Sequence, residues 1–284
     1  MITFTNQAFL SYNNRVTNSN ITTGQIVSVL SGEKTALLDS YTVGSAVTYV
    51  VSIVNSGSAS FNGLTLTDSL GGYEFGENTV YPLAYTPDSL KYFVNGVLQD
   101  APEITAGPPL TVRGISVPAG GNAIIVYETT VTDYAPLGEN STITNEAVIS
   151  GNGLTAPLVL TETVGSTDEP LLTITKSLSP IVVPENGELT YTFVIQNFGN
   201  SPATAEDNAV ITDIFDPILN NITVVFNGEE WSSPENYTYD TNTGAFATVA
   251  GQVTVPAATF VQNPVTGAYT TEPGVSTLTV SGTI

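Results

Sequence analysis

The stretch that decides the fold occurs twice, as TNQAFLS at residues 5–11 and as TNEAVIS at residues 144–150. Apolar and polar side chains alternate in each copy, which is the period of a β-strand with one buried face. The second copy closes a run of predicted strands, whereas no domain precedes the first copy. We therefore interpret residues 1–23 as an arm whose strand completes a domain elsewhere.

Composition narrows the fold class and the kinds of partner. The chain has 284 residues, enough for two domains, and helical patterns are nearly absent, which predicts an all-β protein. Its 26 acidic and 5 basic residues argue against nucleic acid as a partner, because phosphate binding needs clustered Lys and Arg. With no Cys and no His, disulfides, zinc fingers and His-based catalytic triads are excluded.

The sequence also carries signals about location and ligands. No apolar run is long enough to span a bilayer, so we expect no membrane insertion. The N-terminus lacks the basic and apolar regions of an export signal. We expect a mature chain, or one that reaches an extracellular or spore surface by another route. We expect no cofactor and no metal site, although acidic loops leave calcium binding through oxygen ligands open.

Aligning the chain with itself gives two copies of one unit, with Lys34 matching Lys176 and Asp68 matching Asp213. Short strands separated by frequent turns predict an immunoglobulin-like β-sandwich in each copy. The expected boundaries are a first domain at 24–165, a polar linker at 166–170 and a second domain at 171–284.

The second copy lacks one strand of the first. Strands are expected in the first domain at 45–55, 62–68, 90–98, 110–117, 122–132 and 141–150. Residues 276–284 of the second domain match 123–131, and no counterpart of the closing strand 142–150 follows them. This predicts a second sandwich without its final strand, to be completed by an arm of the same type.

Three motifs of the second unit give a family resemblance: LTITK at 172–176, LTYTFVIQNFG at 189–199 and AVITD at 209–213. The first unit repeats the pattern in VTYVVSIVNSG at 47–57 and LTLTD at 64–68. These motifs resemble the conserved-repeat domain of unknown function (DUF-eleven) that is common in Gram-positive surface proteins. The whole chain is also similar to the ribbon-forming spore-appendage proteins of clostridia. The resemblance implies an extracellular type of β-sandwich and gives no reaction or ligand.

Polar residues interrupt the apolar face of several predicted strands. Asn145 shares its face with Ile143 and Ala147, and Asp68 shares its face with Leu64 and Leu66. Lys34 and Lys176 fall on comparable faces, as does Asp213. In the arm, the residues on one face are Phe4, Asn6, Ala8 and Leu10. A lone buried charge is costly, so these residues are expected to have partners.

Two interpretations of these residues remain open at this point. The first is a hydrogen-bonded Lys–Asp pair with Asn beside it. The second is an intramolecular amide cross-link of the kind seen in Gram-positive pilins, in which a buried neutral Lys amine attacks the Asn side-chain carbonyl. Lys34 would join Asn145, with Asp68 as the acid. Lys176, with Asp213 as its acid, would join Asn6 of another copy.

These observations favour a structural subunit that assembles head-to-tail with copies of itself, because the donor strand and the open domain are different surfaces. Other appendage or surface proteins remain open as partners. An alternative is a monomeric adhesin, a module that binds carbohydrate or a host molecule. A third interpretation places the arm in the second domain of its own chain. Activity on an external substrate is not expected.

Overall fold

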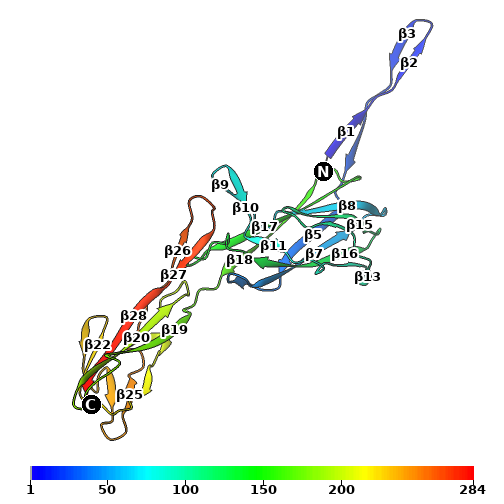
Figure 1. Cartoon of the computed structure of the whole chain (residues 1–284). Coiled ribbons are helices and arrows are strands. Elements are labelled where there is room, and N and C mark those ends of the chain that lie inside the picture. Colours follow the sequence, from blue (N-terminus) through cyan, green and yellow to red (C-terminus); the bar gives the residue numbers. More distant parts are fainter. Residues whose placement is uncertain (1) are drawn as a thin grey trace. The chain divides into compact units, whose positions relative to one another are not determined.

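The computed structural model describes residues 2–284, which are built almost entirely from β-strands (Figure 1). The only helix in this range is a 3-10 turn, Ala205–Asp207, so the predicted all-β class is confirmed. None of the described residues form a helix long and apolar enough to cross a bilayer. The strands form two compact units. Unit 1 reaches Ala135 and includes Thr142–Gly165, and unit 2 comprises Pro136–Ser141 with Ser166–Ile284.

The first sheet of unit 1 follows from strands whose burial alternates residue by residue. In β7 the buried side chains include Val47, Tyr49, Val51 and Ile53. The strand order is β13 (Val97–Gln99), β12 (Lys91–Val94), β16 (Asn122–Val131), β7 (Ala46–Asn55) and β5 (Leu30–Ala36), and β11 (Leu83–Tyr85) also pairs with β16.

The second sheet of unit 1 also contains six strands, and its apolar face is equally regular. Leu64 and Leu66 of β8 are fully buried, as are Ala147 and Ile149 of β17. The strand order is β14 (Glu103–Thr105), β15 (Leu110–Val117), β8 (Phe61–Asp68), β17 (Thr142–Ser150), β18 (Leu158–Ser166) and β6 (Ser40–Tyr41). A separate hairpin joins β9 (Tyr73–Phe75) to β10 (Asn78–Val80).

The single strand expected at 90–98 is a hairpin instead, formed by β12 and β13. Its turn residues, Asn95 and Gly96, have φ values of 48° and 79°. An Asn-Gly pair with two positive φ values is the favoured two-residue turn between antiparallel strands, so the chain reverses here.

The first sheet of unit 2 has the strand order of the first sheet of unit 1, here given from the opposite end. The second sheet of unit 2 has only three strands. The first sheet is β19 (Leu172–Ser179), β20 (Glu188–Asn197), β28 (Gly274–Thr283), β22 (Asn220–Phe226) and β23 (Glu229–Trp231). The second is β21 (Thr212–Ile214), β25 (Ala245–Thr248) and β24 (Tyr237–Tyr239). A hairpin joins β26 (Thr259–Gln262) to β27 (Tyr269–Glu272). The core of the unit contains Tyr191, Phe193, Phe215, Phe246 and Leu278.

The arm is a two-stranded ribbon rather than one continuous strand (Figure 1). β1 (Ile2–Asn6) pairs with β4 (Thr22–Ile26), and β2 (Phe9–Tyr12) pairs with β3 (Arg15–Asn18). The expected strand is interrupted at Gln7 and Ala8, where the side chain and backbone of Ser19 accept hydrogen bonds in place of the regular ladder.

Candidate functional site

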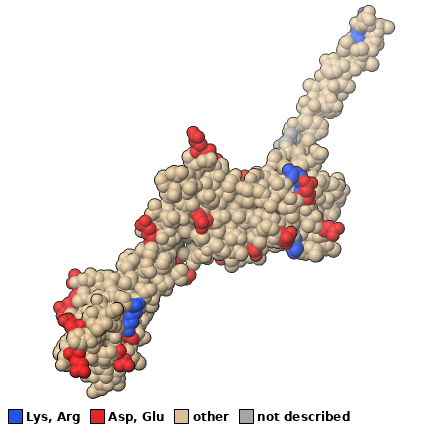
Figure 2. Space-filling view, in the orientation of Figure 1, with Lys and Arg blue, Asp and Glu red and all other residues tan. Residues whose placement is uncertain are grey.

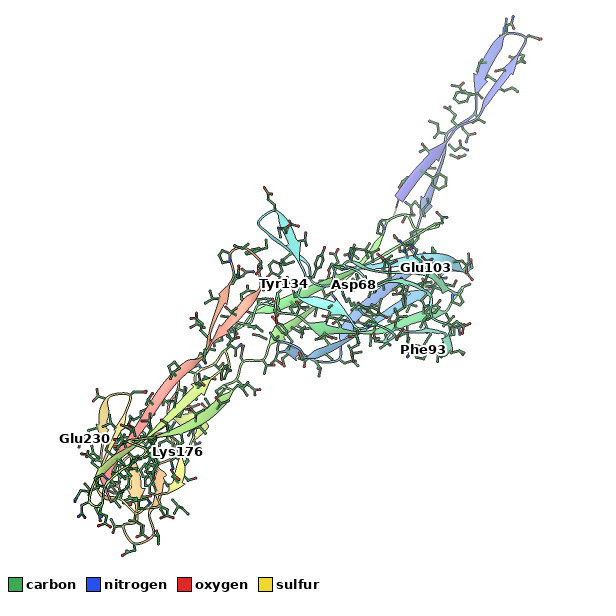
Figure 3. The ribbon with its side chains drawn as sticks, in the orientation of Figure 1. Asp68, Phe93, Glu103, Tyr134, Lys176 and Glu230 are labelled. Carbon is green, nitrogen blue, oxygen red and sulfur yellow. The ribbon has the colours of Figure 1, made fainter. Side chains whose placement is uncertain are left out.

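The structure brings Lys34 and Asp68 together in the interior of unit 1. The Lys34 Nζ atom lies 2.6 Å from Asp68 Oδ2, and both side chains are fully buried. Lys34 comes from β5 and Asp68 from the end of β8, so the pair connects the two sheets. Lys34 Nζ also donates to the backbone carbonyl of Asn145, 3.1 Å away. Asp68 is labelled in Figure 3.

The acceptor oxygens of Asp68 meet only donor groups. Oδ1 accepts from the Leu70 backbone N–H at 2.9 Å. Oδ2 accepts from the Tyr127 hydroxyl as well as from Lys34. Both carboxyl oxygens of Asp68 are therefore held by hydrogen bonds from neighbouring groups.

The Asn145 side chain presents a polarised carbonyl beside this pair. Its Oδ1 accepts from the Gly71 backbone N–H and from the Ser69 hydroxyl, each at 3.2 Å. Two donors on one carbonyl oxygen resemble the arrangement that stabilises the oxyanion of acyl-transfer reactions. The amide nitrogen of this fully buried residue forms no hydrogen bond of ordinary length to any described residue.

Burial dominates the electrostatics of the centre. It lowers the pKa of Lys34, and the attraction of Asp68 offsets part of that shift. Burial raises the pKa of Tyr49 and Tyr127, and the charge of Asp68 adds to both shifts. The neutral amine, the form that can act as a nucleophile, is therefore more accessible for Lys34 than for an exposed lysine.

Unit 2 holds the corresponding pair in a more exposed setting. Lys176 Nζ contacts Asp213 Oδ2, with side-chain exposures of 38% and 18%. The ammonium lies 4.2 Å from the centroid of the Tyr191 ring, a cation–π distance. Lys176 is labelled in Figure 3.

The surroundings of the two pairs differ. Ile214 follows Asp213 where Ser69 follows Asp68. Tyr127 lies opposite Tyr49 in the sheet of unit 1, whereas Val280 lies opposite Tyr191 in unit 2. In the described chain no Asn side chain hydrogen-bonds to Lys176 or Asp213. The pair in unit 2 therefore has no neighbouring Asn side chain and no counterparts of the Ser69 and Tyr127 hydroxyl groups.

One edge of unit 2 is open. In unit 1, β8 pairs with β15 on one side and with β17 on the other. Its counterpart β21 pairs with β25, and among residues 2–284 no strand pairs with its other edge. Unpaired backbone N–H and C=O groups at such an edge are a template for another strand.

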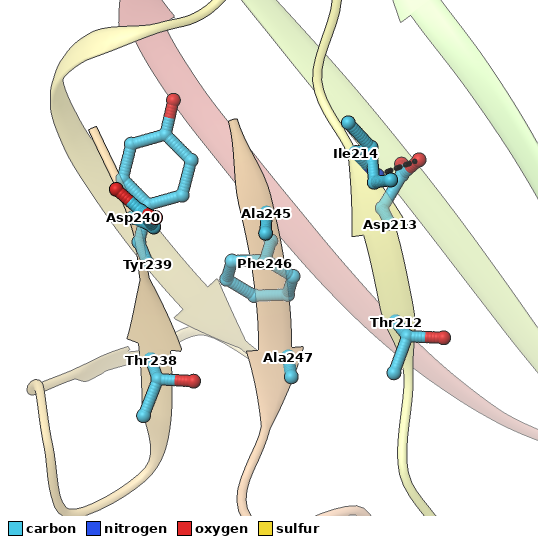
Figure 4. A pocket seen from close by; sticks show the side chains of 9 residues that line it. All are labelled: Thr212, Asp213, Ile214, Thr238, Tyr239, Asp240, Ala245, Phe246 and Ala247. Atoms are coloured by element: carbon cyan, nitrogen blue, oxygen red, sulfur yellow. Dashed lines mark hydrogen bonds between the residues drawn. The ribbon is translucent and has the colours of Figure 1, made fainter. Parts of the chain in front are cut away.

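Apolar side chains and hollows surround this edge. Ile174 of β19 is 51% exposed and Ile214 of β21 is 70% exposed. A hollow of about 340 Å³ lies between β19 and β21, lined by residues that include Lys176 and Asp213. A second hollow of about 690 Å³ lies over the small sheet, with Tyr239 and Phe246 in its lining (Figure 4).

The arm residues identified from the sequence lie on the surface. Phe4 is 50% exposed and Leu10 is 62% exposed, and Asn6 and Ala8 are also exposed. Their counterparts Asn145, Ala147 and Ile149 in β17 are fully buried. The same pattern of side chains is thus buried in β17 and exposed to solvent in the arm.

Sequence reasoning missed several groups of the centre in unit 1. Tyr127 lies on the buried face of β16, and its alternation with Ile125 would have placed it there. Ser69 and Gly71 follow β8 in a loop, where no periodicity applies. Trp231 and Tyr237 pack against Phe226 and Phe246.

Comparison with known proteins gives distant structural similarity only. No protein-family model matches the chain. The resemblance to the conserved-repeat family therefore rests on the sequence motifs alone. No curated protein matches the sequence.

Three solved structures illustrate the similarity. The pilus backbone RrgB from Streptococcus pneumoniae has 13% identity and a TM-score of 0.35, over 87% of this chain and 55% of that one. The major pilin BcpA from Bacillus cereus has 11% identity and a TM-score of 0.36, over 95% and 73%. A collagen-binding domain of a Staphylococcus aureus adhesin has 14% identity and a TM-score of 0.32, over 50% and 100%. The chain spans about half the length of the RrgB structure.

Proposed function

We propose that this chain is a structural subunit of a cell-surface or spore-surface fibre, in which the arm of one copy completes unit 2 of the next. The observation that carries the proposal is the open edge of β21 beside a Lys–Asp pair that lacks its amide. The equivalent edge and pair in unit 1 are closed by β17 and Asn145. Because arm and acceptor are different surfaces, repeated donation gives a head-to-tail polymer.

The arm is suited to insertion by its sequence and its charge. Asn6 and Ala8 match Asn145 and Ala147 of the strand that closes unit 1. Residues 2–26 carry a single charged side chain, Arg15, in a protein of net charge −21 (Figure 2). Strand addition would satisfy the edge of β21 and bury apolar side chains on both partners.

The proposal includes an amide bond between Lys34 and Asn145. The neutral Lys34 amine attacks Cγ of Asn145, while Gly71 and Ser69 hold the developing negative charge on Oδ1. Asp68 accepts a proton from the amine and passes it to Asn145 Nδ2, and the Cγ–Nδ2 bond then breaks. One ammonia molecule leaves for each amide bond formed. Asp68 here acts first as a base and then as an acid, rather than as the acid from the start.

The same chemistry would join subunits at Lys176. Asn6 of an inserted arm takes the place that Asn145 occupies in unit 1, beside Lys176 and Asp213. Insertion also covers this partly exposed pair and brings it into surroundings like those of Lys34 and Asp68. The cross-link would then form after assembly and would make it irreversible.

Replacing Lys176 by Ala tests the covalent bond between subunits. We expect wild-type polymers to survive heating in ionic detergent and Lys176→Ala polymers to separate into single chains, because only the wild type has an intersubunit amide. Gel electrophoresis after heating provides the measurement. Lys91→Ala is the matched control, since Lys91 is an exposed residue of β12. Polymers of Lys176→Ala that resist heated detergent as well as the wild type would exclude Lys176 as the linking residue.

A further inference from the structure

The arm and the closing hairpin of unit 1 share more than one strand. In unit 1, β17 is followed by β18, and Asn145 lies opposite Glu162 while Ile143 lies opposite Val164. In the arm, β1 pairs in the same antiparallel sense with β4, so that Asn6 lies opposite Thr22 and Phe4 opposite Gly24. The arm is therefore a counterpart of the whole β17–β18 hairpin.

The second strand of that hairpin covers a part of unit 1 that β17 does not reach. Glu162 of β18 accepts a hydrogen bond from the Ala36 backbone N–H of β5 at 3.3 Å. The Leu160 side chain lies against Gly32 of β5, 3.3 Å from where a Cβ atom would stand. Thus β17 pairs with the edge of β8, and β18 packs over β5.

Both of these places are uncovered in unit 2. The edge of β21 is unpaired among the described residues. β19, the counterpart of β5, has exposed side chains along nearly its whole length, including Ile174 and Leu178. A single donated strand would close the first gap and leave the second open.

One pair of opposite residues in the ribbon, Phe4 and Gly24, indicates which of its faces packs against the neighbouring copy. The arm has Phe4 and Gly24 where the closing hairpin has the buried pair Ile143 and Val164. A Cβ atom on Gly24 would lie 2.4 Å from Phe4 Cζ, so the ring occupies the space that a side chain at position 24 would need. The Phe4 ring thus lies over the bare Cα of Gly24, and the two residues together present an apolar surface on this face of the ribbon.

We infer that the donated element is the two-stranded ribbon, with β1 pairing to β21 and β4 covering β19 of the neighbouring copy. This inference rests on the proposed function and specifies its partner surface. The face that carries Phe4, Asn6, Thr22 and Gly24 turns inward, and the face that carries Thr5 and Thr23 turns outward, as Thr144 and Thr163 do in unit 1.

Two substitutions in β4 test the ribbon without changing the sequence of β1. Gly24→Asp places a charge on the inward face, and its Cβ displaces the Phe4 ring. We expect it to reduce polymer yield about tenfold, because burying an unpaired charge is costly. Thr23→Asp adds the same charge to the outward face, and we expect its yield to stay within about twofold of the wild type. Electron microscopy and light scattering of the full-length purified chains provide the yields, and thermal unfolding checks that both variants keep their folded units.

The outcomes separate this inference from the proposed function. If both variants polymerise like the wild type while a chain without residues 2–26 does not, a single strand is donated and the ribbon is excluded. If both variants lose assembly equally, the assignment of the inward face is wrong. If the chain without residues 2–26 still assembles, arm donation itself fails.

Discussion

Deletion of residues 2–26 is expected to leave the chain as a soluble monomer under conditions in which the full chain forms fibres. The deletion removes the donor but leaves the two large sheets of unit 1 and the open edge of β21 in unit 2. Sedimentation and negative-stain microscopy of the two purified proteins provide the measurement. Fibres of normal length from the deleted chain would contradict arm donation.

A matched pair of point variants sharpens this prediction without removing any chain. Ala8→Lys puts a charge at the position whose counterpart, Ala147, is fully buried in unit 1. Thr5→Lys puts the same charge at a position whose counterpart, Thr144, is exposed. We expect assembly to be lost in the first variant and retained in the second. A full-length protein that stays monomeric would instead favour the alternative of a monomeric adhesin.

Replacing Lys34 by Met is expected to reduce the free energy of unfolding of unit 1 by about 3–5 kcal/mol, because the substitution leaves Asp68 as a buried carboxylate without its cation. In chains that have formed the amide bond Lys34 is neutral, and the substitution instead removes a covalent link between β5 and β17. Urea or thermal unfolding gives the size of the change. Arg113→Met is a suitable control, because its partner Glu103 is 73% exposed and the two charges are 3.9 Å apart. We expect that control to cost less than about 1 kcal/mol.

The intact mass of the same proteins reports the bond directly. Wild-type chain is expected to be lighter than its sequence mass by one ammonia molecule for the Lys34–Asn145 bond, whereas Lys34→Met and Asn145→Ala should match their sequence masses. A wild-type mass equal to the sequence mass would leave Lys34 and Asp68 as a buried ion pair only. A destabilised Lys34→Met variant would then still be expected, because the substitution removes the cation of that buried ion pair.

The buried faces of strands and the matching residues of the two repeats could be predicted from the sequence, because they depend on strand periodicity and on the internal repeat. Alternation placed Asp68 and Asn145 on buried faces, and self-alignment matched Lys176 to Lys34. Which residues of neighbouring strands lie opposite one another was not predictable, because pairing register depends on turns and bulges. The interruption of the arm at Gln7 illustrates this limit, since side-chain hydrogen bonds to Ser19 end the strand where the apolar pattern continues.

The groups around the Lys–Asp pair were harder to foresee. Gly71 contributes a backbone N–H, which has no signature in side-chain patterns. Tyr127 reaches Asp68 from the opposite sheet, a contact that depends on how the two sheets pack. The second strand of the arm was missed for a related reason. Residues 22–26 contain Thr, Gly and Gln in place of an apolar run, and only pairing with β1 identifies them as a strand.

The central claim is that Asn6 of one copy meets Lys176 of another. Polymers grown from an equal mixture of unlabelled and nitrogen-15-labelled chains, digested with a protease and analysed by mass spectrometry, test this claim most directly. We predict a cross-linked peptide that contains Asn6 and Lys176, lacks one ammonia, and occurs with one labelled and one unlabelled half. The absence of this peptide, or its occurrence only with both halves labelled alike, would contradict the donation of the arm between copies.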